Sequence, residues 1–186
     1  CQAVHTHPMP RSRLRDACHL LRSLGNGIRF LIARDWVPAM DALVDQQLDT
    51  ADFDCVHADQ LWMAPYALRA RSYVAARKPS IPSLVLDQHN AVHMIPARMA
   101  EKERNPAKQT LMTLEAKKMA RYEATVCRRF DQVVWVTKQD YEAVQGQVED
   151  ASTSIPRSAV IPICVNPAGT PMLVPRSDPR RVTFLG

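Results

Sequence analysis

Short apolar runs alternate with longer amphipathic segments along most of the chain, and this alternation constrains the fold more than any other feature. Strand-like runs are predicted at residues 28–33, 53–58, 83–86, 133–136, 159–161 and 182–185. Helical spacing of apolar residues predicts helices at 14–24, 38–48, 59–77 and 96–130, the last broken near Asn105-Pro106. Because parallel strands need helical crossovers, this order predicts an α/β protein with a Rossmann-like doubly wound parallel sheet.

The domain organisation follows from the same pattern. Residues 1–165 are predicted to form one Rossmann-like domain, in which the first strand would precede Cys1. The proline-rich residues 166–180 read as an interdomain linker that leads into the run 182–185. Residues 166–186 are therefore predicted to be this linker and the first strand of a second domain, and we expect both ends to be cuts through a larger protein.

The low glycine content excludes several kinds of glycine-rich phosphate-binding loop. Only five glycines occur among 186 residues, and neither G-x-x-x-x-G-K-[ST] nor G-x-G-x-x-G is present. The formal net charge of +5 favours acidic partners such as phosphates or anionic lipid surfaces. Arg11, Arg13 and Arg15 form the densest basic group, but no aromatic residues are interleaved with them, so no nucleic-acid partner is predicted.

The most informative stretch carries three polar residues directly behind a strand-like run. Asp87, His89 and Asn90 follow residues 83–86, and ligands of open α/β sheets bind outside the carboxyl ends of the strands. The alternative is that Asp87 caps a turn and His89 is an ordinary rim residue. Asp87, His89 and His93 could also bind a metal, but without H-E-x-x-H or a second ligand cluster no metal is predicted.

Two further polar residues follow strand-like runs. Thr137 ends the run 133–136, where its hydroxyl and a helix N-terminus would favour an anion, although simple helix capping is the default interpretation. Asp59 follows the run 53–58 and is predicted to be a helix N-cap rather than a catalytic acid.

Four segments together resemble the N-terminal half of a glycosyltransferase family 4 enzyme, a retaining sugar transferase of GT-B fold. They are residues 53–60 (FDCVHADQ), 86–90 (LDQHN), 115–140 (from EAKKMARYE through FDQVVWV to TKQD) and 160–166 (VIPICVN). Each motif alone is weakly specific, and their order is the stronger signal. The resemblance spans most of the chain from Phe53 onward.

The resemblance implies an acceptor-side domain that faces a second, donor-binding domain across a cleft. His89 would then be the catalytic residue, positioning and stabilising the charge of the departing diphosphate or of the oxocarbenium-like sugar. Asp87, Asn90 and Thr137 would contact substrate, and Arg11, Arg13 and Arg15 would attract an anionic acceptor, either a glycan or a lipid-linked one. No cofactor is expected, because the nucleotide sugar is a co-substrate.

Five widely spaced cysteines without a C-x-x-C motif predict reduced thiols in a cytoplasmic protein, and the resemblance adds peripheral contact with the inner face of the membrane. Three other functions stay open at this point. They are a sugar-nucleotide epimerase of the same fold, a metal-dependent hydrolase built on Asp87, His89 and His93, and a non-catalytic domain that binds phosphorylated ligands.

Overall fold

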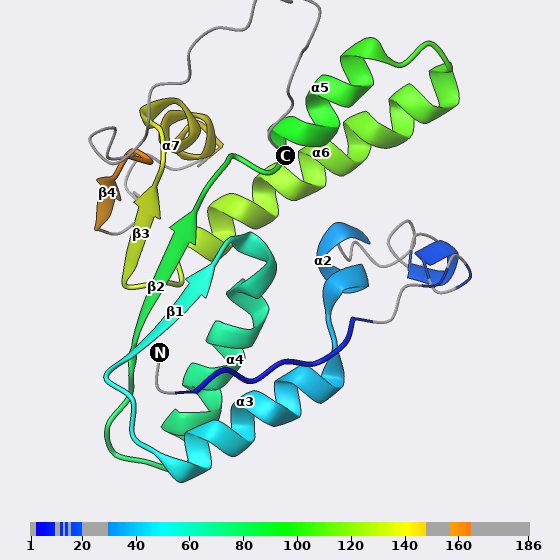
Figure 1. The fold of residues 1–186 in the computed structure, drawn as a ribbon. Helices are drawn as coiled ribbons and strands as arrows, with labels where there is room; N and C mark the ends of the chain where they lie inside the picture. Colours follow the sequence, from blue (N-terminus) through cyan, green and yellow to red (C-terminus); the bar gives the residue numbers. More distant parts are fainter. Residues whose placement is uncertain are drawn as a thin grey trace, which may run out of the picture.

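The fold is built on a sheet of four parallel strands, seen in a computed structural model that describes residues 3–9, 12, 14, 16–19, 30–147 and 157–164. The strands are β1 (Cys55–Asp59), β2 (Ser83–Gln88), β3 (Gln132–Trp135) and β4 (Ser158–Val160), which lie side by side in that order (Figure 1). The predicted α/β class and the Rossmann-like parallel sheet are thus confirmed. Four of the predicted strands also occur, with ends displaced by at most two residues.

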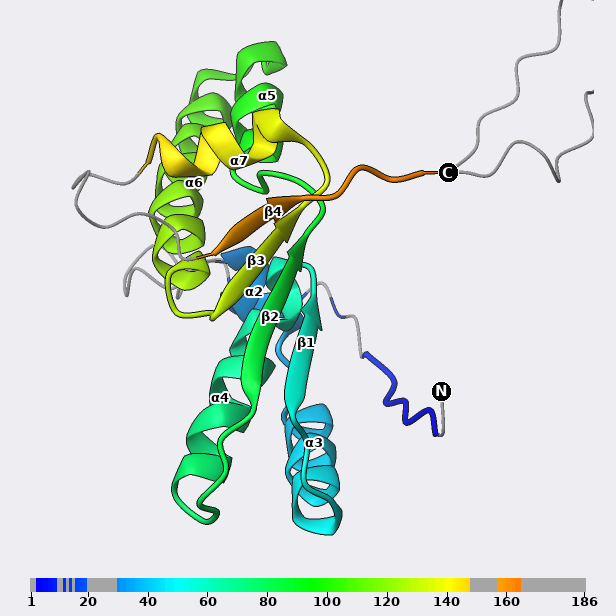
Figure 2. The ribbon, with the colours of Figure 1, turned by 90° about the vertical axis from the view of Figure 1, so that its left-hand side faces the viewer.

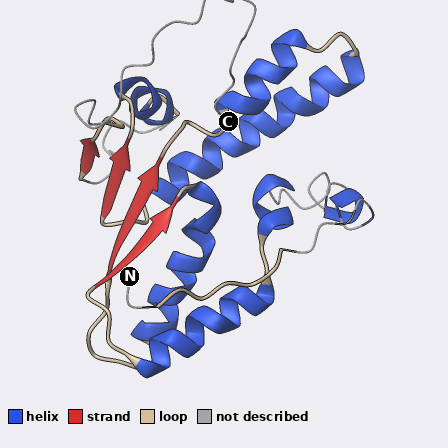
Figure 3. Ribbon diagram, viewed as in Figure 1, coloured by secondary structure: helices blue, strands red, loops and turns tan. Residues whose placement is uncertain are grey.

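Helices connect the strands and cover the sheet (Figure 3). They are α2 (Phe30–Asp35), α3 (Pro38–Thr50), the 3-10 turn η1 (Leu61–Met63), α4 (Ala64–Ala75), α5 (Met94–Lys102), α6 (Pro106–Cys127) and α7 (Lys138–Gln145). Figures 1 and 2 show α3, α4 and α6 on one face of the sheet. None of the described helices is long and apolar enough to cross a membrane.

The core lies between this face of the sheet and its helices. Burial alternates along β2, where Leu84, Leu86 and Gln88 are buried and the residues between them are only partly buried. Trp135 and Met119 are fully buried against them. Since side chains alternate across a strand, residues at odd numbers such as Asp87 face away from this core.

The break in the long helical segment is confirmed. Asn105 lies between α5 and α6, and its side chain accepts hydrogen bonds from the backbone N–H groups of Ala107 and Lys108. Pro106 occupies the first position of α6, where no N–H donor is needed. The two helices therefore form a hairpin that extends away from the sheet (Figure 1).

One predicted strand is wrong. Residues 30–33 of the predicted run belong to helix α2, and residues 28–29 lie outside the described residues. A short apolar run fits a strand or a buried helix equally well, so contacts with the rest of the fold decide. Here the Trp36 ring stacks on Tyr66 of α4 at 4.4 Å, and the Val37 N–H donates to the Tyr66 hydroxyl at 2.7 Å.

The helix predicted from residue 59 begins later than expected, because β1 continues to Asp59 and η1 precedes α4. Helix α3 matches its prediction at the amino end and runs two residues further. Residues 16–19 are helical, whereas the remainder of the predicted helix 14–24 is only partly within the described residues. The predicted linker and the run 182–185 lie outside them.

Candidate functional site

Two carboxylates and an imidazole meet at the carboxyl ends of β1 and β2. Asp59 ends β1 and is paired in register with Asp87 of β2, so both side chains project from the same face of the sheet. His89 follows β2 by one residue. Its Nε2 atom lies 3.1 Å from Asp59 Oδ1 and 3.6 Å from Asp87 Oδ1. The structure thus joins two of the predicted site residues, Asp87 and His89, and adds Asp59.

The prediction that Asp59 caps a helix is wrong. Asp59 is still part of the strand, and its side chain is largely exposed and directed to His89. His57, two residues earlier on the same face, places Nε2 at 3.8 Å from Asp87 Oδ2. The register of two adjacent parallel strands produces this cluster, and sequence alone does not show which strands are neighbours.

The orientation of the His89 ring is set by a chain of hydrogen bonds. The Trp62 indole N–H donates to Gln60 Oε1 at 3.0 Å, and the Gln60 amide nitrogen lies 3.3 Å from His89 Nδ1. Because an indole only donates, the Gln60 oxygen must face Trp62 and its NH₂ group must face His89. In neutral His89, Nδ1 therefore accepts, and Nε2 carries the proton, 3.1 Å from Asp59 Oδ1.

Gln60 reaches this position only in a left-handed backbone conformation. Its φ of 70° is the one positive value at a non-glycine residue in the described part of the chain. Its N–H donates to the Asp87 carbonyl at 2.8 Å, which ties the end of β1 to the end of β2. Such a conformation costs about 1–3 kcal/mol and is found preferentially at functional sites.

The buried carboxylate of Glu123 on α6 accepts hydrogen bonds from the loop that carries His89. Glu123 Oε1 accepts from the Val92 N–H at 2.7 Å and, at very short range, from the Gln88 amide. Glu123 Oε2 accepts from the His93 N–H at 3.2 Å and from His93 Nδ1 at 2.7 Å. All four donors come from residues 88–93, so one fully buried side chain holds the Gln88 side chain before His89 and the Val92 and His93 backbone after it.

Sequence reasoning missed Glu123, although a signal was present. Glu123 lies on the same helical stripe as the small residues Ala116, Ala120 and Cys127, which predict close packing. A carboxylate on such a face must find donors inside the protein. The surroundings are apolar: burial, and secondarily the Glu123 carboxylate, raises the pKa of the Cys127 thiol far above its ordinary value.

A second carboxylate holds the other side of the loop. Asp140 Oδ1 accepts from the Ala91 N–H at 2.8 Å. Thr137 N-caps α7, since its hydroxyl accepts from the Asp140 N–H at 3.1 Å and also lies in close contact with Asp140 Oδ2. The default interpretation of Thr137 as a cap is therefore confirmed, and its predicted contact with substrate stays a prediction.

The other predicted site residues divide into three groups. Asn90 is exposed beside His89, and its carbonyl accepts from the Gln88 amide at 2.9 Å. Arg11, Arg13 and Arg15 lie outside the described residues. His93 does not join Asp87 and His89 in the alternative metal site, because it is buried and bound to Glu123.

A different metal set is geometrically available. Asp59, Asp87 and His89 each offer one ligand atom, and these atoms lie within 4.8 Å of one another. The hydrogen bond from Gln60 to Nδ1, however, leaves the proton on the nitrogen that faces the carboxylates. The arrangement therefore places one N–H group, that of His89 Nε2, close to two carboxylates.

Comparison of the chain with protein-family models, with curated proteins and with solved structures found no match.

Proposed function

We propose that this chain is the acceptor-side domain of a retaining glycosyltransferase, which moves a sugar from a nucleotide-sugar donor to a hydroxyl acceptor. The observation that carries the proposal is the Asp59–His89–Asp87 cluster at the carboxyl edge of the parallel sheet. Ligands of open α/β sheets bind at this edge. The order of motifs that resembles glycosyltransferase family 4 supports the same function.

The chemistry of the cluster suits a sugar better than a free phosphate. Two carboxylates repel an anion but accept hydrogen bonds from neutral hydroxyl groups. A sugar hydroxyl that enters between His89 and Asp59 accepts from Nε2–H and donates to the carboxylate, so it satisfies both groups. The geometry therefore supports a site for a polyhydroxyl acceptor.

His89 would position the acceptor, and the carboxylates beside it would stabilise positive charge on the oxocarbenium-like sugar. The alternative role of His89 at the departing diphosphate stays a prediction of the resemblance. Asp87 and Asn90 would contact the acceptor. The nucleotide sugar would bind to a second domain outside this chain, and no cofactor would be needed. Roles for Arg11, Arg13, Arg15 and Thr137, a cytoplasmic location and peripheral contact with the inner membrane face stay predictions from the sequence.

The test is sugar transfer by the full-length protein, measured as nucleoside diphosphate release and glycoside formation over a panel of nucleotide sugars and acceptors. We expect His89→Ala to lower kcat by about 100-fold, the range for misplacement of a reacting group. Asp59→Asn is expected to raise the KM for the acceptor more than that for the donor. Asp49→Asn, which removes a carboxylate from α3, serves as the matched control.

Transfer by His89→Ala at near wild-type rates would contradict the assigned role of His89. Release of nucleotide without any acceptor, or isomerisation of the donor sugar, would instead indicate the epimerase alternative. If residues 1–186 alone transferred sugar, the division into acceptor and donor domains would be wrong.

Metal-dependent hydrolysis is the second candidate, because Asp59, Asp87 and His89 bring three ligand atoms together. Calorimetric titration with Zn²⁺ and Mn²⁺ separates the two functions. Stoichiometric binding that Asp59→Asn abolishes would favour the hydrolase. Transfer activity that survives EDTA would favour the glycosyltransferase.

A further inference from the structure

His93 and Glu123 form a buried dyad that opens onto a cavity away from His89. Glu123 is fully buried and His93 is 6% exposed. Because a carboxylate only accepts, the 2.7 Å contact requires that His93 Nδ1 donates to Glu123 Oε2. The other ring nitrogen, Nε2, has no hydrogen-bond partner among the described residues.

The cavity lies between the two helices of the hairpin and has a volume of about 390 Å³. Its wall is formed by alanines of α5 and α6, namely Ala97, Ala100, Ala116 and Ala120, together with His93. Exposed side chains, among them Glu101 and Lys117 of opposite charge, complete its lining. The size falls within the range of small-molecule sites.

Two polar side chains of the wall, Thr113 and Gln109, already donate to backbone carbonyls. The Thr113 hydroxyl donates to the Gln109 carbonyl at 2.9 Å, and the Gln109 amide donates to the Ala100 carbonyl at 3.2 Å. A ligand in this cavity therefore meets mostly apolar surface and one unsatisfied ring nitrogen. Because Nε2 is not sealed off inside the protein, a ligand in the cavity can form a hydrogen bond with it.

We propose that this cavity binds an apolar molecule that carries a hydroxyl group, such as a phenol or an aliphatic alcohol, with the hydroxyl on His93 Nε2. A hydroxyl both donates and accepts, so it fits Nε2 whether the imidazole is neutral or protonated. The opposite charges of Glu101 and Lys117 give no preference for an ionic ligand. This site is separate from the proposed acceptor site and does not depend on the proposed function.

Calorimetric titration of the protein with 4-methylphenol and with toluene tests the proposal, because the two probes differ only in the hydroxyl group. We expect 4-methylphenol to bind about tenfold more tightly than toluene, the effect of one satisfied hydrogen bond. His93→Asn keeps an amide donor near the position of Nδ1 but lacks Nε2. This variant is expected to bring the two affinities within about twofold of each other.

A cavity-filling variant keeps the test decisive if His93→Asn does not fold. Ala116→Leu, on the buried face of α6, is expected to weaken both probes, whereas Ala107→Leu, on the exposed first turn of α6, should leave both unchanged. Equal affinity of the wild-type protein for the two probes, absence of binding, or an unchanged affinity ratio in folded His93→Asn would each overturn the proposal.

Discussion

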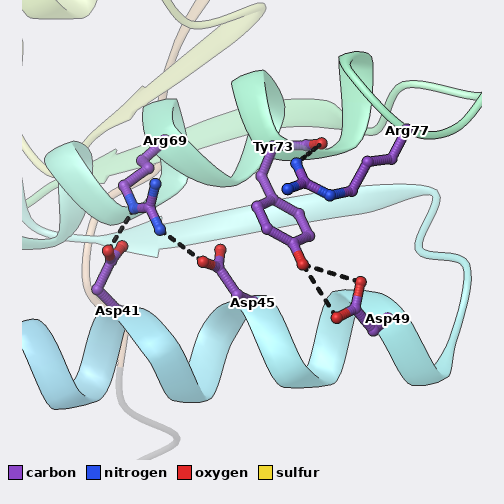
Figure 4. A network of polar contacts seen from close by, with 6 residues as sticks. All are labelled: Asp41, Asp45, Asp49, Arg69, Tyr73 and Arg77. Atoms are coloured by element: carbon purple, nitrogen blue, oxygen red, sulfur yellow. Dashed lines mark hydrogen bonds and ion pairs between the residues drawn. The ribbon is translucent and has the colours of Figure 1, made fainter.

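The buried carboxylate of Glu123 and the surface carboxylates of α3 hold their neighbours by similar hydrogen bonds in very different surroundings. On the surface, Asp41 and Asp45 both contact the Arg69 guanidinium, and Asp49 accepts from the Tyr73 hydroxyl at 3.0 and 2.9 Å (Figure 4). These contacts join α3 to α4, and the Arg69 side chain remains 44% exposed. Glu123 is fully buried instead.

This difference in burial decides which of these contacts contribute most to the stability of the protein. In a surface ion pair both charged groups stay largely hydrated, so the pair contributes only about 0–1 kcal/mol to the free energy of unfolding. A buried carboxylate with several donors leaves those donors unsatisfied when it is removed, which costs several kcal/mol. The loop 88–93 beside the candidate site is therefore fixed by an interior contact, whereas the α3–α4 surface is fixed mainly by apolar packing. Carboxylates that accept from fewer buried donors should show a graded series of smaller effects.

The largest effect is expected for Glu123→Ala, which leaves four donors of residues 88–93 without an acceptor. We expect the free energy of unfolding to fall by about 3–5 kcal/mol, measured by urea denaturation. Glu142→Gln, on the exposed side of α7, is the matched control and should change stability by less than about 0.5 kcal/mol. If the two substitutions changed stability equally, interior and surface carboxylates would not differ in their contribution to stability.

An intermediate effect is expected for Asp140→Ala. Asp140 is only partly buried, but it accepts from the Ala91 N–H and lies in the first turn of α7. Loss of this hydrogen bond and of the helix-dipole contact should destabilise the protein by about 1–2 kcal/mol in the same denaturation assay. Gln139→Ala in the same turn controls for helix propensity. If Asp140→Ala destabilised the protein as much as Glu123→Ala, burial would not set the order of the destabilising effects.

The smallest effect is expected for Asp45→Asn on α3, where Asp45 is partly buried and contacts the Arg69 guanidinium, whose side chain is 44% exposed. Burial raises the pKa of Asp45, although Arg69 opposes the shift. The folded state therefore holds this proton more tightly than the unfolded state, so stability is lost as pH rises through the raised pKa. Between about pH 3 and pH 7, the stability of the wild type relative to Asp45→Asn should therefore fall, measured by denaturation of both proteins. A steeper loss in the variant would mean that the Arg69 contact outweighs the cost of burial.

The sequence predicts the parallel sheet well because apolar runs and helical spacing are local patterns. It also predicts that Asp87 and His89 lie at the carboxyl edge, since both follow a strand. It does not predict Asp59 as their partner, which depends on the register of β1 against β2. Residues 30–33 were assigned to a strand because a short apolar run lacks periodicity, and contacts of the adjoining Trp36 and Val37 with Tyr66 decide otherwise.

Hydrogen exchange of the Val92 and His93 backbone amides tests most directly whether Glu123 fixes the loop beside His89. Both N–H groups donate to Glu123 inside the protein. We predict that they exchange only through global unfolding, as slowly as the N–H of Leu86 in the central strand β2. Exchange at the rate of an exposed loop, such as the one around Asn105, would contradict the account.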